Sequence, residues 1–168
     1  SCTQKGSSAA WKGLTTNVLS HDTAIYENSF SVEGGTFDNA GHVSSQIKAL
    51  LKKMKLSKEV VRRAALVTYE AEINICSYAD RGKIHLRVTP EHVTVEAIDE
   101  GQGIVDIELA MQAGYSTATE RIREMGFGAG MGLGNIKNFS DFFRITSEIG
   151  KGTCLKMVIR IDKDFDGI

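Results

Sequence analysis

Several features are scarce or absent in this sequence of 168 residues, and each absence narrows the class of protein. Pro90 is the only proline, so no Pro-rich linker divides the chain, and the length favours one domain. No apolar run approaches the length of a membrane span, and the first residues lack the apolar stretch of a signal peptide. The net charge of −1 provides no basic footprint for nucleic acid or an anionic membrane. We therefore expect neither as a direct partner.

Cysteine is also sparse. The three cysteines, Cys2, Cys76 and Cys154, lie far apart in the chain and form no CxxC pair. This usage is typical of proteins in a reducing compartment and does not favour a cysteine metal site. A cytoplasmic location is the expectation that follows.

What is present is a regular pattern of strands and helices after residue 23. Residues 1–23, rich in Ser, Thr, Gly and Asn, are expected to form a flexible arm. Asp38 or Asn39 is expected to cap the first helix, and Ser57 the second. The pattern predicts these elements in order: a strand at 24–32, helices at 43–54 and 57–79, strands at 83–89 and 92–98, a short helix at 106–113, a loop at 114–129, a further helix, and strands at 143–149 and 154–161.

This order of elements predicts an α+β fold. Because the strands pair as hairpins and several gather late in the chain, we expect a two-layer α/β sandwich. Its sheet would be mixed but mostly antiparallel, and helices would cover one face. Residues 24–168 would form this single domain.

Three stretches far apart in the chain carry residue types that suit one ligand, and the first is YEAEINICSYA. Glu70 and Asn74 are four residues apart, so they project from one face of the predicted helix. An Asn oxygen can bind Mg²⁺, and a Glu carboxylate can accept a proton or orient a nucleophile. A solvated helical stripe is the simpler interpretation, which a lone ExxxN pair fits more often.

The second stretch is DEGQG, which follows a buried strand. Asp99 at the end of that strand can accept a hydrogen bond from an exocyclic amino group. Gly101 and Gly103 would let the backbone approach a flat ring closely. Taken alone, the stretch fits an ordinary Gly-rich turn at the end of a strand better than it fits a ligand site.

The third stretch is GFGAGMGLGNIK, residues 126–137, a Gly-rich loop that continues into a helix. The N-terminus of such a helix offers backbone N–H groups and a positive dipole end to phosphate oxygens. A flexible linker is the alternative, but linkers seldom carry Phe127, Met131 and Leu133 between their glycines. No GK[ST] follows, so the stretch is not a P-loop, and no strand precedes it as in a dinucleotide fingerprint.

Together and in this order, ExxxN, DxGxG and the glycine-rich loop resemble the ATP-binding domain of gyrase B, Hsp90, histidine kinases and MutL, known as the Bergerat fold. The resemblance covers residues 24–163 and implies ATP and Mg²⁺, with Glu70 as the catalytic base and Asn74 as the Mg²⁺ ligand. A final Gly-Lys-Gly-Thr turn would bring Thr153 near the adenine. The nucleotide contacts that it implies are Asn74, Asp99, Gly101, Gly103, Tyr115, Ser116, Thr117, Gly128, Gly130, Met131, Gly132, Leu133, Gly134, Lys137 and Thr153.

Within that superfamily, GIVDIELAMQAGYST (residues 103–117) is similar to the small bacterial serine/threonine kinases that switch anti-sigma-factor and stress-response pathways. The resemblance implies an ATP-dependent transferase that regulates transcription by phosphorylating Ser or Thr of a small antagonist protein. It also allows a sigma factor or another regulator as a partner, and a homodimer. Three departures concern the identity of the partner: the loop at 117–127 is longer than in these kinases, Asn135 replaces a small residue, and Ala113 stands where an acidic residue is common.

Two other functions use the same residues. In one, ATP or ADP only sets the loop conformation, and the closed form binds a sigma factor or regulator without turnover. In the other, the protein hydrolyses ATP slowly and has no protein acceptor. The presence of Glu70 favours chemistry, because a protein that only binds has no need of a base.

Overall fold

The computed structural model describes residues 8–12, 23–116, 118–120 and 130–162, with the backbone alone described for 8–12. The elements along this part of the chain are β1 (Ser8–Lys12), β2 (Tyr26–Glu33), α1 (His42–Lys53), α2 (Lys58–Tyr78), β3 (Ala79–Val88), β4 (His92–Gly101), α3 (Ile107–Ala110), α5 (Gly132–Phe139), β5 (Phe142–Glu148) and β6 (Gly152–Arg160). None of the described helices has both the length and the apolar character that spanning a bilayer requires.

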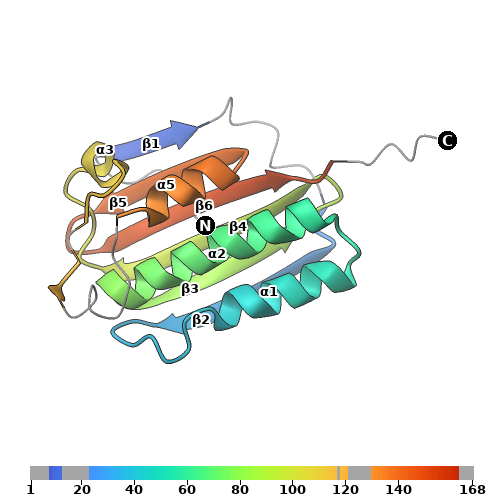
Figure 1. Cartoon of the computed structure of the whole chain (residues 1–168), viewed down its shortest axis with the longest axis horizontal. Helices are drawn as coiled ribbons and strands as arrows, with labels where there is room; N and C mark the ends of the chain where they lie inside the picture. The colour runs from blue at the N-terminus through green and yellow to red at the C-terminus, as the bar shows by residue number, and fades with distance from the viewer. Residues whose placement is uncertain (1–7, 13–22, 117, 121–129, 163–168) are drawn as a thin grey trace.

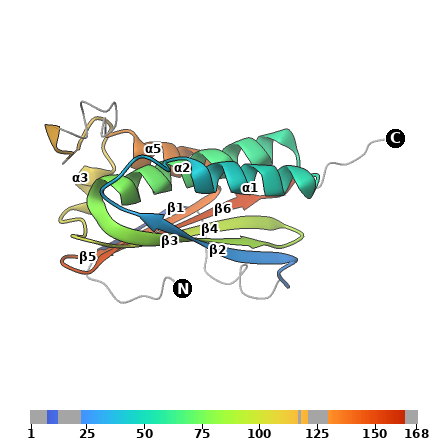
Figure 2. The same cartoon turned by 90° about the horizontal axis from the view of Figure 1, so that it is seen from below.

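The strands form one six-stranded sheet in the order β1-β5-β6-β4-β3-β2. Every neighbouring pair in this order is antiparallel. Figure 1 shows α1, α2 and α5 side by side with α2 in the middle, and Figure 2 shows all three on one face of the sheet. The two-layer α/β sandwich predicted from the sequence is confirmed, and the sheet is antiparallel throughout rather than mixed.

One strand lies inside the range expected to be a flexible arm. Residues of β1 pair with β5, from Ser8 opposite Ser147 to Lys12 opposite Phe143. The sequence SAAWK has too little alternation to predict a strand by itself. The open edge of β5 supplies the backbone partners, and no local pattern could reveal that edge.

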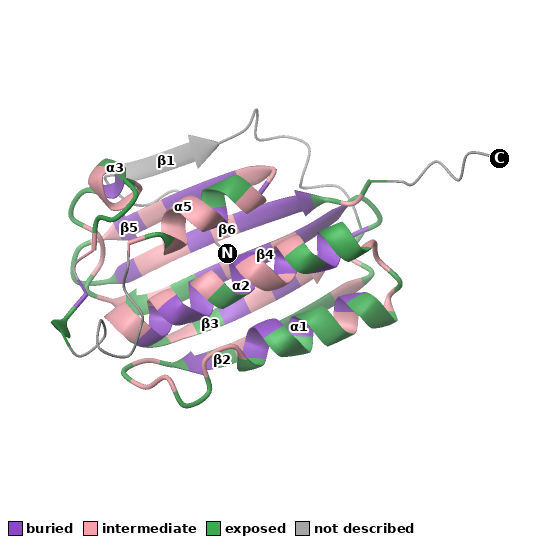
Figure 3. Ribbon diagram, viewed as in Figure 1, coloured by how far each residue is buried: buried purple, intermediate pink, exposed green. Residues whose placement is uncertain are grey.

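The core lies between the sheet and α2. Side chains alternate along each strand, so one set from each strand faces the helices. The fully buried members of this set include Ile84, Leu86, Val95, Ile145, Met157 and Ile159. From α2, Val67, Ala71 and Ile75 are buried against them, and Figure 3 shows these inner faces in purple. Because α2 is packed on the sheet along its length, the side chains on its two flanks are held in place.

The two predicted helix caps had different outcomes. Ser57 caps α2 as expected, since its side chain accepts a hydrogen bond from the Val60 N–H at 3.3 Å. The expectation of a cap at Asp38 or Asn39 is wrong, because α1 begins at His42 with Gly41 as its N-cap and no side-chain cap bond.

The start of α1 is instead capped by a residue of α2. Glu72 accepts hydrogen bonds from the N–H groups of Val43 and Ser44, each at 2.9 Å. Its side chain is almost fully buried, at 2% exposure. Burial raises the pKa of Glu72, and the bonds from Ser44 and Val43 oppose this shift. The carboxylate supplies the acceptor that the first N–H groups of a helix lack within their own helix.

Candidate functional site

Glu70 and Asn74 lie on the flank of α2 that faces α5, opposite the flank that carries Glu72. A Cβ atom at Gly132, the first residue of α5, would be 3.1 Å from Oε2 of Glu70 and 3.4 Å from Oδ1 of Asn74. The side-chain amide of Asn135 donates a hydrogen bond to Oε1 of Glu70 at 3.1 Å. The structure therefore brings the first and third sequence stretches into contact.

The first turn of α5 presents backbone donors beside this pair. The N–H of Asn135 donates to the carbonyl of Met131 at 2.9 Å and is the first N–H of the helix in an intrahelical bond. The N–H groups of Gly132, Leu133 and Gly134 precede it and have no acceptor within the helix. No described atom lies within 4 Å of the Cβ position at Gly134. Met131 is exposed and Leu133 packs against the core, so this turn is anchored on one side and open on the other.

Asp99 lies near the end of β4 with one oxygen engaged. Its Oδ1 accepts hydrogen bonds from the N–H groups of Gly101 at 2.9 Å and Thr153 at 3.1 Å. Oδ2 accepts none from the described part of the chain. Burial raises the pKa of Asp99, and the bonds from Gly101 and Thr153 act in the opposite direction. The result is an oriented carboxyl group with one oxygen available to a donor such as an amino group.

The glycines after Asp99 are required by the backbone of the protein itself. A Cβ atom at Gly101 would lie 2.7 Å from the carbonyl oxygen of Tyr78, at the end of α2. Gly103 has a φ of +79°, and a Cβ atom there would lie 2.5 Å from the carbonyl oxygen of Glu148. The sequence analysis explained both glycines by the approach of a flat ring. The structure shows a different cause, close contact with neighbouring carbonyl groups, and the ring contact stays a prediction.

Thr153 belongs to a hydroxyl network that includes Ser147, which the sequence analysis missed. The Ser147 hydroxyl donates to the carbonyl of Gly152 at 3.0 Å and accepts from the N–H of Ile104 at 2.8 Å. Since that hydroxyl has a single hydrogen, Thr153 must be the donor in the 2.9 Å contact between the two hydroxyl oxygens. Ser147 and Thr153 are directly opposite in the β5–β6 hairpin, so the register of the hairpin could have revealed Ser147 from the sequence.

The described ends of the segment between α3 and α5 meet beside α2. The N–H of Gly114 donates to the carbonyl of Gly130 at 3.2 Å, and the hydroxyl groups of Tyr78 and Ser116 are 3.2 Å apart. Gly130 has a φ of +75°, and a Cβ atom there would lie 2.3 Å from the carbonyl oxygen of Tyr115, so only glycine fits. The side chain of Tyr115 is exposed. Tyr78 was also missed, although its spacing of four from Asn74 places both on one helix face.

Three residues expected at the site are not placed there by the described structure. Lys137 is exposed in the last turn of α5, away from the first turn that faces Glu70 and Asn74. Thr117 and Gly128 lie outside the described residues.

A Mg²⁺ ion at Asn74 would have few protein ligands. No group of three or more His, Cys, Asp and Glu side chains in the described ranges is arranged to hold a metal ion. Mg²⁺ usually keeps several waters and takes its other oxygens from one or two protein groups and the phosphates of the substrate. A single Asn oxygen next to a helix start with free N–H groups, which could hold phosphate oxygens, fits that mode of binding.

The parts of the site form one line of contacts across the C-terminal half of α2. Gly101, whose N–H donates to Asp99, lies at the carbonyl of Tyr78, and Asn74, one helical turn earlier, lies at Gly132. One end of the line has an oriented carboxyl oxygen that can accept a hydrogen bond from the amino group of an aromatic ring. The other end has free helix N–H groups, a carboxylate and an amide oxygen. This set of groups suits a molecule with an aromatic amine at one end and phosphates at the other.

Comparison with known proteins gives a consistent result. The family model of the histidine kinase-like ATPase domain matches residues 36–159. An anti-sigma F factor of Thermoanaerobacter sp. (strain X514) is 36% identical, over 63% of this chain and 66% of the relative. The serine/threonine-protein kinase RsbT of Bacillus subtilis (strain 168) is 33% identical, over 60% and 64%. An anti-sigma F factor of Clostridium beijerinckii is 30% identical, over 74% and 72%. The chain thus spans just under two thirds of the length of the first two relatives.

Proposed function

Since the chain belongs to the histidine kinase-like ATPase domain family, in the branch of the anti-sigma F factors and RsbT, we propose that it is a protein serine/threonine kinase. It would bind ATP with Mg²⁺ and transfer the γ-phosphoryl group to Ser or Thr of a small antagonist protein. One observation carries the proposal: a Cβ atom at Gly132, the first residue of α5, would lie 3.1 Å from Oε2 of Glu70 and 3.4 Å from Oδ1 of Asn74. A carboxylate, an amide oxygen and the N-terminus of a helix thereby meet, which supports the roles of base, Mg²⁺ ligand and phosphate-binding site.

Each residue has a role in this reaction. The amides of Gly132, Leu133 and Gly134 donate to phosphate oxygens, and Asn74 would hold the Mg²⁺. The ion, when bound, offsets the negative charge that develops on the phosphates. Glu70 accepts the proton of the acceptor hydroxyl while the oxygen of that hydroxyl forms a bond to the γ-phosphorus. The bond from that phosphorus to ADP breaks, so the products are ADP and a phosphorylated side chain.

The adenine would lie at Asp99, and this placement can be tested with Asp99→Asn. The variant keeps an oxygen for the N–H groups of Gly101 and Thr153, but its NH₂ group would meet the adenine amino group donor to donor. Hydrogen bonds to charged groups contribute about 1.5–3 kcal/mol, so ATP affinity should fall roughly 10- to 100-fold. Isothermal titration calorimetry with ATP checks this value, and an affinity equal to the parent's would contradict the placement.

The same variant should not destabilise the nucleotide-free protein at neutral pH. Because burial raises the pKa of Asp99 above its unfolded-state value, the native state binds more protons between the two values. The parent therefore loses stability as the pH rises through that window, whereas Asp99→Asn does not. Thermal unfolding at pH 7 should find the variant at least as stable as the parent. A clear drop in melting temperature would mean that lost binding reflects damage to the fold.

A second candidate function is a nucleotide-gated binding module. The contact of Gly114 with Gly130 and of Tyr78 with Ser116 favours it, because these bonds couple the segment after α3 to the site. ATP labelled at the γ-phosphate separates the alternatives when it is incubated with candidate antagonist domains. Label on Ser or Thr supports the kinase, and nucleotide-dependent co-elution without label supports the module. Labelled inorganic phosphate without an acceptor indicates slow hydrolysis.

The remaining proposals concern partners and location. The name anti-sigma F factor, carried by two of the relatives described above, supports a sigma factor as a second partner. We propose a cytoplasmic location, where ATP and sigma factors are found. The cysteines do not support this proposal as the sequence predicted, because Cys154 is disulfide-bonded and Cys76 alone among the described cysteines is a free thiol. A homodimer is the proposed form, and sedimentation of the purified protein with and without ATP tests it.

A further inference from the structure

We propose that Asn135 is a positioning residue for Glu70, so that Oε2 of Glu70 is the oxygen that accepts the proton of the acceptor hydroxyl. This inference rests on the proposed kinase function and adds a residue and an atom to it.

The contacts of Glu70 distinguish its two carboxylate oxygens. Oε1 accepts the hydrogen bond from the Asn135 amide at 3.1 Å. Oε2 lies at the first turn of α5, 3.1 Å from the Cβ position of Gly132, and Oδ1 of Asn74 lies 3.4 Å from the same point. The last torsion of a Glu side chain has a broad minimum, so a carboxylate without such a bond rotates readily. With Oε1 held, Oε2 remains directed at the end of the helix that would bind the phosphates.

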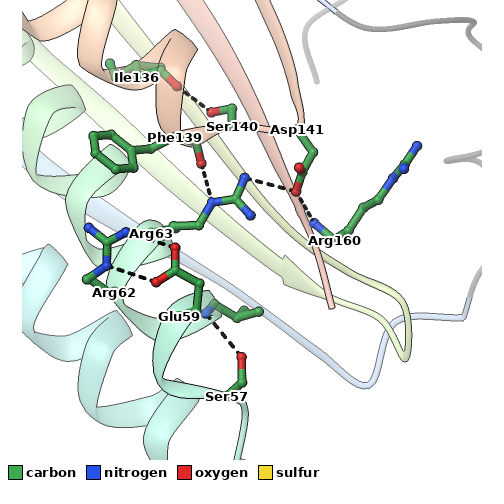
Figure 4. Close-up of polar contacts among 10 residues, drawn as sticks. Ser57, Glu59, Arg62, Arg63, Ile136, Phe139, Ser140, Asp141 and Arg160 are labelled. Carbon is green, nitrogen blue, oxygen red and sulfur yellow. Dashed lines mark hydrogen bonds and ion pairs between the residues drawn. The ribbon is translucent and has the colours of Figure 1, made fainter. Parts of the chain in front are cut away.

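The position of Asn135 is set by α5, which is fixed independently of this contact. The neighbouring Ile136 is fully buried in the core, at 0% exposure, and determines which side of α5 faces inward. At the other end of the helix, the Arg63 side chain of α2 donates to the carbonyl of Phe139 at 2.9 Å and pairs with Asp141 at 3.1 Å. Figure 4 shows this anchor together with Ser140, whose hydroxyl donates to the carbonyl of Ile136 at 2.7 Å.

A helix held at its buried face and its C-terminal end presents Asn135 to Glu70 as a preorganised donor. Side chains that orient a catalytic group from rigid elements act on the rate of the chemical step more than on binding. The N–H of Asn135 is used within the helix, so it is not one of the free backbone donors at the start of α5. Its removal should therefore lower kcat and leave the affinity for ATP unchanged.

The first test compares Asn135→Ala with Asn138→Ala, which changes an exposed Asn of the same helix. We expect kcat for phosphotransfer to fall roughly 10-fold in Asn135→Ala, the value of about one lost hydrogen bond. ATP affinity by calorimetry should be unchanged, and Asn138→Ala should match the parent in both. Asn135→Asp keeps the shape but places a carboxylate against Glu70, so its kcat should be lower than that of Asn135→Ala. Equal rates for parent and Asn135→Ala overturn the inference, as does a loss confined to ATP affinity.

A double-mutant cycle shows whether Asn135 acts through Glu70. In a Glu70→Ala background, Asn135→Ala should leave the residual rate of phosphotransfer unchanged. In urea unfolding of the nucleotide-free protein with the same background, Asn135→Ala should lower the free energy of unfolding no more than Asn138→Ala does. Equal, additive losses in both backgrounds overturn the inference.

The unfolding cycle needs no activity, so it separates this inference from the proposed function. A parent protein that labels no acceptor overturns the kinase proposal and, with it, the role of Asn135 in positioning a catalytic base. If the losses in free energy of unfolding from Glu70→Ala and Asn135→Ala are not additive, the contact between the two side chains is still supported. If they are additive, the contact is overturned as well.

Discussion

Replacing Glu70 with alanine is expected to slow phosphotransfer by about 10²–10⁴-fold, the usual contribution of a positioned general base. Oε2 of Glu70 lies 3.1 Å from the Cβ position of Gly132 in the first turn of α5, and the amide oxygen of Asn74 lies 3.4 Å from the same position. Without it, the proton of the attacking hydroxyl has no acceptor at the place where the γ-phosphoryl group would lie. ATP binding should remain close to that of the parent, because its main contacts in the proposal are made by Asp99, Asn74 and the amides of α5.

The measurement is single-turnover transfer from labelled ATP, together with calorimetry of ATP binding. Glu70→Gln is the informative companion, since its amide oxygen can still accept from Asn135 while the group no longer accepts a proton at neutral pH. It should be nearly as slow as Glu70→Ala. Glu59→Ala changes an exposed carboxylate of the same helix and should match the parent. If Glu70→Ala transferred phosphate at the parent rate, Glu70 would not be the base.

Replacing Glu72 with alanine is expected to lower the free energy of unfolding by about 2–5 kcal/mol without any direct effect on chemistry. Each buried donor left without a partner costs roughly 1–3 kcal/mol. This change removes the acceptor of the N–H groups of Val43 and Ser44. These groups lie at the buried start of α1, where no side chain of α1 itself replaces the acceptor. The loss should appear as a lower midpoint in urea with an unchanged slope.

The pH dependence of this loss has a definite sign. Burial raises the pKa of Glu72 above its unfolded-state value, so the native state binds more protons than the unfolded state between the two values. The contribution of Glu72 to stability is therefore greatest below the unfolded-state value and falls as the pH rises through the window. The difference between parent and Glu72→Ala should accordingly be larger at acid pH than at neutral pH.

Glu72→Gln separates the two effects. It keeps one acceptor oxygen and no charge, so its loss should be smaller than that of Glu72→Ala and should not change across the window. A loss for Glu72→Ala no greater than that for Glu59→Ala would show that the contacts with α1 contribute little. The nucleotide affinity of folded Glu72→Ala serves as a check that the Asp99 end of the site is intact.

The neighbouring carboxylates Glu70 and Glu72 show how far sequence reasoning reaches. The spacing of Glu70 and Asn74 predicted that both lie on one face of a helix, and they do. The same pattern gave no indication that Glu72, two residues along and so on the other flank, caps α1 in place of Asp38 or Asn39. Which flank of α2 faces which helix depends on how three helices pack on the sheet.

The glycines also show that a sequence pattern does not reveal which segments meet in space. Their clustering predicted close approach, and the structure shows it at Gly101, Gly103 and Gly130. The partners in these contacts are carbonyl groups of Tyr78, Glu148 and Tyr115, which belong to other segments. A pattern of glycines shows that a side chain would not fit, but not what occupies its place.

From the sequence alone came the two-layer fold, the helical pairing of Glu70 with Asn74 and the proposal that three stretches share a site. These follow from alternation, from the spacing of residues along a helix and from a motif order, all of which are local or additive along the chain. Only the tertiary structure decided that Asn135 binds Glu70, that Glu72 caps α1, that Tyr78 meets Ser116 and that β1 joins the sheet. Each of these depends on the distance between segments separated in sequence, which is set by the packing of α1, α2 and α5 on one face of the sheet.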